Sequence, residues 1–98
     1  MKLPHLFAPA AKEEFAAAAD WYERQKGGLG DHFVEVILAL IDRICEHPMM
    51  FAVVDGDVRQ AIERQFPYSI LFRIQNGFVV IIAVFHSSRD PSVWQNRL

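Results

Sequence analysis

The dipeptide Asn76-Gly77 constrains the fold most, because it separates two long runs of strand-forming residues. A two-residue hairpin turn prefers asparagine followed by glycine, since both residues tolerate a positive φ. Residues 68–75 form two alternating sets, Tyr68, Ile70, Phe72 and Ile74 against Ser69, Leu71, Arg73 and Gln75, which is typical of a strand with one buried face. Residues 78–85 are continuously apolar and rich in Val and Ile, which favours a central strand with both faces covered. The sequence therefore predicts an antiparallel hairpin inside a sheet.

Two segments before this hairpin carry apolar side chains at helical spacing. The first begins at Pro9, which suits the first turn of a helix because its missing N–H needs no partner there. It is expected to end near Gly27-Gly28, since glycine ends helices at little cost. The second has Asp31 as its expected N-cap and ends at His47-Pro48. So short a link predicts an antiparallel helix hairpin that covers one surface.

The other segments complete the expected sheet. Residues 2–7 are a short extended candidate, and residues 58–65 are a plausible strand. Residues 49–57 are expected to form a loop ending in a turn, and residues 90–94 a final helical turn. The expected fold class is α+β: an N-terminal strand, an antiparallel helix hairpin packed on a mostly antiparallel sheet, and a short C-terminal tail. The sheet is expected to contain a three-strand meander.

The length of 98 residues predicts one domain spanning residues 1–98. Hydrophobic residues make up 52% of the chain, which argues against intrinsic disorder. The longest apolar run is far too short to span a membrane, and the N-terminal segment is too short for a signal peptide. The single cysteine, Cys45, fits a reducing compartment and is interpreted as a small buried hydrophobe. We therefore expect a cytoplasmic protein with no membrane partner.

The net charge of −2 hides an uneven distribution of charge. Residues 1–57 carry five Lys and Arg against ten Asp and Glu, whereas residues 58–98 carry five Arg against two acidic residues. Arg59, Arg64 and Arg73 lie along the predicted strands, and Arg89 lies in the tail. Arginine binds phosphate or carboxylate in a bidentate manner, so these four are candidates for holding phosphate or an acidic partner segment. The alternative is ordinary surface arginine paired with nearby carboxylates, since the sequence does not determine strand register.

His86 ends the buried strand and is the one candidate general acid or base. The alternative, which we favour, is a histidine that hydrogen-bonds locally. Trp94 is interpreted as an anchor that packs the tail and is also a candidate contact residue. The four histidines lie too far apart to suggest a metal site, and the chain has no phosphate loop or other cofactor motif, so we expect no metal and no cofactor.

Three groups of residues together resemble the signatures of the RelE/ParE superfamily of bacterial toxins. The first group, in the helix hairpin, comprises residues 19–25, Gly28-Leu29-Gly30 and Phe33. The second group, at the start of the sheet, comprises Pro48, Val58-Arg59 and residues 64–68. The third group, in the last strand and the tail, comprises residues 83–86, Arg89-Asp90-Pro91, Trp94 and Arg97. The resemblance spans about residues 19–97 in the expected order. No single group is specific, but the set is.

The resemblance implies a toxin of a type II toxin–antitoxin system, neutralised by a cognate antitoxin and linked to plasmid stabilisation. RelE-like members cut mRNA on the ribosome, and ParE-like members poison DNA gyrase. The acidic net charge and the lack of a tyrosine after Tyr68 favour a ParE-like gyrase inhibitor that is not an enzyme. Two alternatives stay open. One is a ribosome-dependent mRNA endonuclease with His86 and Arg64 as acid/base and phosphate clamp. The other is a non-toxic partner-binding module on the same fold.

Overall fold

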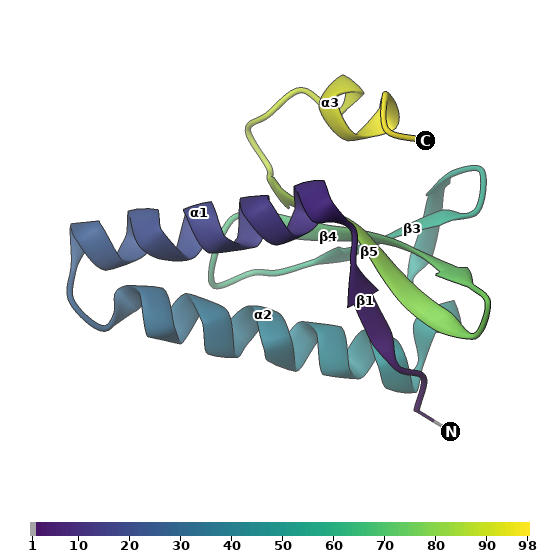
Figure 1. Cartoon of the computed structure of the whole chain (residues 1–98), viewed down its shortest axis with the longest axis horizontal. Helices are drawn as coiled ribbons and strands as arrows, with labels where there is room; N and C mark the ends of the chain where they lie inside the picture. The colour runs from purple at the N-terminus through teal and green to yellow at the C-terminus, as the bar shows by residue number, and fades with distance from the viewer. Residues whose placement is uncertain (1) are drawn as a thin grey trace.

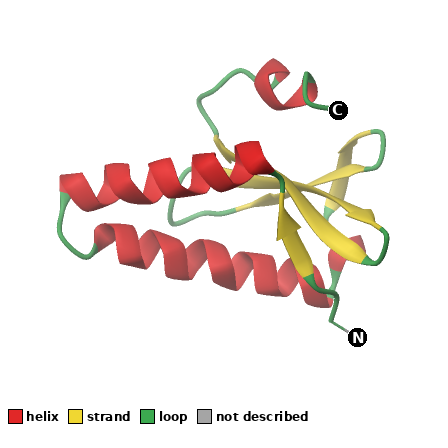
Figure 2. Cartoon of the chain, viewed as in Figure 1, coloured by secondary structure: helices red, strands yellow, loops and turns green. Residues whose placement is uncertain are grey.

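The computed structural model describes residues 2–98 and arranges them as a helix hairpin lying against a twisted sheet (Figure 1). The elements in chain order are β1 (His5–Phe7), α1 (Pro9–Gln25), α2 (Leu29–Glu46), the 3-10 turn η1 (Pro48–Met50), β2 (Ala52–Asp55), β3 (Val58–Ile62), β4 (Tyr68–Gln75), β5 (Phe78–His86) and α3 (Ser92–Gln95). Figure 2 shows the two long helices running side by side, away from the short α3. Among the described residues, no helix is long and apolar enough to cross a membrane.

The five strands form one sheet in the order β1-β5-β4-β3-β2. Strands β2 to β5 form an antiparallel meander, and β1 pairs with β5 in parallel. Asn76 and Gly77 both have positive φ, 52° and 78°, which is the conformation that a primed hairpin turn requires. Strand β5 lies inside the sheet, between β1 and β4. The central hairpin and the α+β fold class predicted from the sequence are thus confirmed.

The turn between the helices is built around Glu23 rather than around Asp31. Helix α2 begins at Leu29, and its N-cap is Gly28, with a φ of 87°, so the prediction that Asp31 caps this helix is wrong. The Glu23 carboxylate accepts hydrogen bonds from the backbone N–H groups of Gly28 (2.9 Å) and Gly30 (3.0 Å), which satisfies donors that a helix start leaves free. A Cβ on Gly30 would lie 2.5 Å from the carbonyl oxygen of Ala19, so only glycine allows this close approach.

Two apolar clusters cover the two faces of the sheet. The helix face is packed by α1 and α2 against sheet residues that include Ala61, Ile70, Phe72, Val79, Ile81 and Val84. The other face is packed by the tail, through Trp94 and Val93, against Val58, Leu71, Ile82, Ala83 and Phe85. The expectation of one buried face for residues 68–75 is therefore wrong. Leu71 is 1% exposed because the C-terminal tail covers the face assigned to solvent, and Ser69 on the same strand is 6% exposed.

The chain between residues 49 and 65 also differs from the expectation. The predicted loop contains η1 and the edge strand β2, so the meander has four strands instead of three. All four residues of β2 are exposed, and such a strand carries no alternation of buried and exposed positions to detect. Strand β3 ends at Ile62 rather than continuing to residue 65, because the Glu63 carboxylate accepts hydrogen bonds from the next two backbone N–H groups.

Candidate functional site

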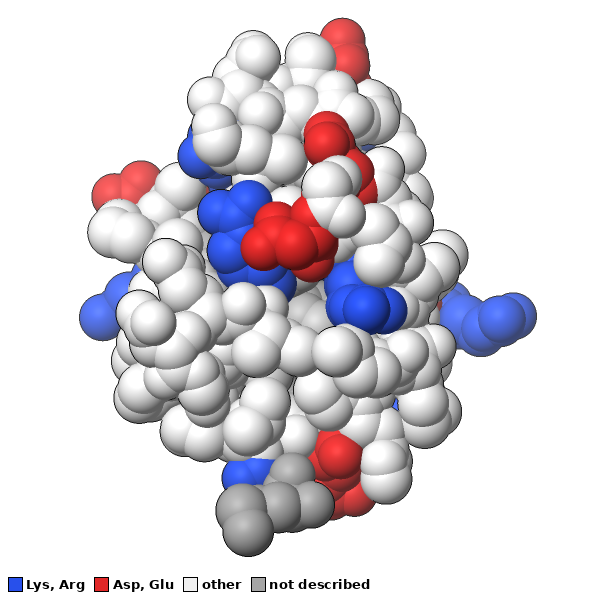
Figure 3. All heavy atoms as spheres, turned by 90° about the vertical axis from the view of Figure 1, so that its right-hand side faces the viewer, with Lys and Arg blue, Asp and Glu red and all other residues white. Residues whose placement is uncertain are grey.

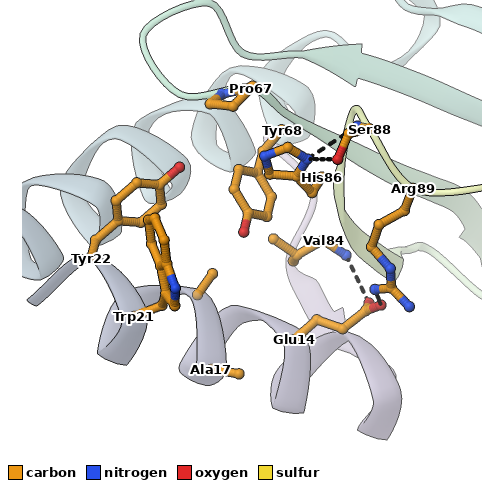
Figure 4. A pocket seen from close by; sticks show the side chains of 11 residues that line it. Glu14, Ala17, Trp21, Tyr22, Pro67, Tyr68, Val84, His86, Ser88 and Arg89 are labelled. Atoms are coloured by element: carbon orange, nitrogen blue, oxygen red, sulfur yellow. Dashed lines mark hydrogen bonds and ion pairs between the residues drawn. The ribbon is translucent and has the colours of Figure 1, made fainter. Parts of the chain in front are cut away.

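A groove of about 620 Å³ opens between helix α1 and the end of strand β5, and we call it the α1–β5 groove (Figure 4). Helix α1 contributes Glu14, Ala17, Ala18, Trp21 and Tyr22 to its lining. The sheet and the loop after it contribute Pro67, Tyr68, Val84, His86, Ser88 and Arg89. Segments far apart in the sequence therefore meet here, and His86 and Arg89 are the two residues suggested by the sequence that the groove brings together.

The groove exists because β1 covers only part of β5. The parallel pairing of β1 with β5 ends at Ile81. The pairing of β4 with β5 then skips Ile82, which is the extra residue of a β-bulge. On the edge that β1 leaves uncovered, the backbone N–H of Val84 donates to Glu14 Oε1 at 3.1 Å. The carbonyl of Ile82 accepts a hydrogen bond from Arg97 Nη1, also at 3.1 Å. Two side chains thus take over the hydrogen bonds that a longer β1 would make.

Glu14 is the charged centre of this edge, with a side chain that is 14% exposed. Arg97 binds both of its oxygens, with Nη1–Oε1 at 3.0 Å and Nη2–Oε2 at 2.8 Å, and Arg89 Nη1 lies 3.2 Å from Oε2. The hydrogen bond to Glu14 raises the pKa of Arg97 above its ordinary value, against the opposing effect of burial. The bidentate pair joins helix α1 to the C-terminal tail and fixes one end of the groove.

Aromatic rings form the walls of the groove. The ring centroids of Tyr22 and Tyr68 lie 6.2 Å apart, and those of Tyr68 and His86 lie 5.1 Å apart in an edge-to-face arrangement. Burial raises the pKa of both Tyr22 and Tyr68 above the ordinary value of 10.0. Both phenols therefore keep their protons at neutral pH and can donate hydrogen bonds.

The tautomer of His86 follows from its contacts with Ser88. Nδ1 of His86 lies 3.0 Å from the backbone N–H of Ser88 and 2.7 Å from its Oγ. A backbone N–H can only donate, so Nδ1 is the acceptor and Nε2 carries the proton in the neutral ring. Figure 4 shows the other ring nitrogen turned away from Ser88, towards the groove. His86 hydrogen-bonds locally, as favoured from the sequence, and it also presents a donor to the groove.

The candidate arginines do not form one basic surface. Arg59 donates to the carbonyl of Phe51 at 2.7 Å, and Arg73 pairs with Asp57 at 3.1 Å. Arg59 lies opposite Phe72 in the β3–β4 register, so Arg73, the next residue of β4, points to the opposite face of the sheet. On the face drawn in Figure 3, basic and acidic side chains lie beside one another rather than in separate patches.

The remaining candidates lie outside the groove. Arg64 is exposed in the segment between β3 and β4. Trp94 is only 6% exposed, and its burial against the sheet makes it an anchor of the tail. The interpretation of Cys45 as a buried hydrophobe is confirmed by its 1% exposure. Among residues 2–98, no three His, Cys, Asp or Glu side chains are grouped so that they could hold a metal ion.

Three residues of the groove, Glu14, Trp21 and Tyr68, are not among the candidates suggested by the sequence. A signal existed for Glu14, because positions 11, 14 and 18 follow helical spacing and place this one carboxylate on the buried face of α1. Trp21 lines the groove and is 52% exposed. Tyr68 packs against the helix-side core, and its proximity to His86 depends on the β4–β5 register.

A helix hairpin on one face of a five-stranded, mostly antiparallel sheet, with a short tail on the other, defines the small toxin fold that the sequence resembles. The sequence model of the family described as "ParE toxin of type II toxin-antitoxin system, parDE" matches residues 6–91, and the chain belongs to this family. It is thus a toxin of a type II toxin–antitoxin system.

Two solved structures are similar to this chain. A chain of the chromosomal ParDE toxin–antitoxin system from P. aeruginosa superposes with a TM-score of 0.76 at 17% identity, covering 87% of this chain and 96% of that one. A chain of the RelBE2 toxin–antitoxin complex from Mycobacterium tuberculosis gives a TM-score of 0.62 at 16% identity, covering 88% and 99%. At these identities the likeness concerns the fold. No curated protein sequence matches the chain.

Proposed function

We propose that this toxin inhibits DNA gyrase in the bacterial cytoplasm and that a cognate antitoxin neutralises it. The proposal rests on the pairing of the arginines with carboxylates. Arg73, Arg89 and Arg97 are each paired with a carboxylate of the same chain. An mRNA endonuclease acting on the ribosome has to meet dense phosphate charge, which requires free basic side chains. A net charge of −2 and the internal pairing of these three arginines fit a protein target better.

A ribosome-dependent endonuclease is the second candidate, and one observation favours it. His86, Tyr68 and Arg89 line the same groove, where a donor imidazole, a protonated phenol and a guanidinium lie together. Cleavage of RNA at the 2′-OH needs an acid, a base and charge stabilisation at the phosphate. Arg64, the expected phosphate clamp, does not line the groove, and Arg89 is paired with Glu14. These two facts argue against this candidate.

The proposal is tested by inducing the toxin in bacteria and mapping the 5′ ends of translated mRNAs by primer extension. A gyrase inhibitor leaves the transcripts intact and causes filamentation and a DNA-damage response. His86→Gln then keeps its toxicity, since glutamine retains a polar hydrogen-bonding group and no proton transfer is lost. Cleavage within codons that disappears in His86→Gln would overturn the proposal, because removing a general acid or base slows catalysis by roughly 10²–10⁴-fold.

The proposed antitoxin partner is supported by the family and by the two similar structures, both of which belong to toxin–antitoxin systems. Antitoxin segments that become ordered on binding can cover a large part of a small toxin. Co-expression with the neighbouring gene in the genome tests this part of the proposal. Growth should recover when the two proteins are made together, and the two should copurify. Continued growth arrest together with separate elution would contradict a neutralising partner.

A further inference from the structure

We infer that the edge strand β2 pairs with β2 of a second copy of this chain, in antiparallel orientation about a two-fold axis at Val53, so that two sheets join into one. This inference goes beyond the proposed function and does not depend on the cellular target. It rests on three features of the edge: its unpaired backbone, the apolar side chains gathered around it, and the opposite charges at its two ends.

The unpaired backbone of β2 determines the conformation of its partner. Strand β2 lies at the end of the sheet, pairs only with β3 and has four exposed residues. Free N–H and C=O groups along a strand edge are the groups to which another strand adds. The other edge strand, β1, is three residues long and lies between Pro4 and Pro9. By contrast, β2 contains neither proline nor lysine, the residues that commonly block pairing at an edge.

Apolar side chains gather around this edge. Nine large apolar side chains are exposed in the described part of the chain, and five of them belong to η1, β2 and the end of β3. These five are Met49, Met50, Val53, Val54 and Ile62. The pairing of Ala52 with Gln60 places Ile62, two residues further along β3, beside the start of β2. Exposed apolar side chains that cluster in this way mark a contact surface, whereas scattered ones do not.

The charges at the two ends of β2 make the edge complementary to itself. Before its first residue, Nη1 of Arg59 donates to the carbonyl oxygen of Phe51 at 2.7 Å, so a guanidinium lies beside this end. The strand finishes at the exposed carboxylate of Asp55. In an antiparallel pair centred on Val53, Asp55 of one copy lies opposite Phe51 of the other copy, near its Arg59. A parallel pair would bring the two Asp55 carboxylates together instead, which is unfavourable. The charge pattern therefore favours a second copy related by a two-fold axis.

The contact is expected to be weak and reversible. The β2–β3 register shifts between Val53 and Asp55, and such a bulge shortens the edge that can pair. A stable interface uses about 20–30 residues of each partner, many more than η1 and β2 supply. We therefore expect a monomer–dimer equilibrium with a dissociation constant on the order of 10–100 μM. Because β2 and β1 lie at opposite ends of the sheet, the α1–β5 groove stays open in the dimer.

Analytical ultracentrifugation of the whole chain measures this association. The mean mass should rise from that of one chain towards that of two as the protein concentration passes through the expected range. Val53→Lys should raise the dimer dissociation constant by at least about tenfold, because it places two like charges at the axis. The matched control is Leu6→Lys, which puts the same charge on an exposed residue of the other edge strand and should leave the constant unchanged. Circular dichroism melts verify that both variants are folded.

The position of the axis is tested by cross-linking. Residues opposite one another in an antiparallel pair have Cα atoms about 4.5–5.5 Å apart, and a disulfide spans about 4.4–6.8 Å. Mild oxidation should therefore give a covalent dimer of Val53→Cys and none of Leu6→Cys. The native Cys45 does not interfere, because it is buried. A covalent dimer of Leu6→Cys with none of Val53→Cys would place the contact at the other edge and overturn the inference.

The charge complementarity has its own pair of variants. Asp55→Arg should weaken the dimer, because the new guanidinium faces Arg59 of the second copy. Asp31→Arg makes the same change at an exposed carboxylate on α2 and should have no effect. Equal dissociation constants for the two variants would contradict the antiparallel arrangement.

The remaining outcomes separate a second copy from other partners. The mass of a single chain at every concentration would overturn the inference, and so would a dimer that Val53→Lys leaves intact. Hydrogen exchange of the β2 amides should slow as the concentration of toxin alone rises. Protection of these amides only when antitoxin or gyrase is added would assign the edge to that partner and contradict a second copy. None of these outcomes decides whether gyrase is the target, so the two proposals fail separately.

Discussion

Glu14 and Arg97 form a bidentate ion pair, with oxygen–nitrogen distances of 3.0 and 2.8 Å, that connects the first helix to the last residues of the chain. Each partner also makes one hydrogen bond to the backbone of β5, to Val84 and Ile82 respectively. The pair thus closes the part of the sheet edge that β1 leaves uncovered. Loss of the Glu14 carboxylate would leave the Arg97 guanidinium and the N–H of Val84 without their partner. Since the Glu14 side chain is only 14% exposed, water would replace this partner poorly.

We expect Glu14→Gln to lower the free energy of unfolding by about 1–3 kcal/mol, since an amide keeps the shape but cannot satisfy two guanidinium groups and an N–H. Urea denaturation measures this change. The matched control is Glu13→Gln, which changes the neighbouring, exposed carboxylate and should have a small effect. Equal stability of the two variants would show that the pair with Arg97 contributes nothing.

The turn between the helices gives a second pair of matched variants. Gly30→Ala should lower the free energy of unfolding by about 1–3 kcal/mol, because the new Cβ would overlap the carbonyl of Ala19 and force the helices apart. Gly27→Ala places a Cβ no closer than 3.9 Å to any other group, so its effect should be small or stabilising. Comparing the two unfolding midpoints checks the close approach of α1 and α2 at Gly30.

The two tyrosines of the chain both line the groove, so their titration reports on it directly. The raised pKa values mean that the folded state favours the protonated phenols. The contribution of the phenols to the free energy of unfolding is fully present below pH 10.0, where they are protonated in both the folded and the unfolded chain. It falls as the pH rises further, because the phenols of the unfolded chain ionise first. Absorbance titration should give midpoints above 10.0, and Tyr22→Phe and Tyr68→Phe should each remove one of them. A single transition at the ordinary pKa would contradict the buried, donor state of the phenols.

The sequence was sufficient for those parts of the fold that depend on local chemistry. The Asn76-Gly77 turn, the apolar run of β5 and the two helices follow from φ preferences and periodicity. Strand β2 was missed because an exposed edge strand has no hydrophobic alternation. The burial of Leu71 was missed because it depends on a tail placed over the far face of the sheet.

The site was harder to predict than the fold, because it depends on register. Arg59 and Arg73 look like neighbours along the meander, but the register places them on opposite faces of the sheet. The contact between His86 and Tyr68 follows from the pairing of β4 with β5. The bulge at Ile82, where the uncovered edge of β5 begins, carries no glycine or proline signal in the sequence. Such a site is visible only when the strands are assembled.

The proposed inhibition of DNA gyrase is tested most directly by a supercoiling assay with purified gyrase and relaxed plasmid. If gyrase is the target, the toxin should inhibit supercoiling in a dose-dependent manner, and equimolar antitoxin should restore it. His86→Gln should inhibit as strongly as the wild type, because no proton transfer by His86 is involved. Full supercoiling at a large molar excess of folded toxin, with translated mRNA cut in a parallel ribosome assay, would contradict the claim.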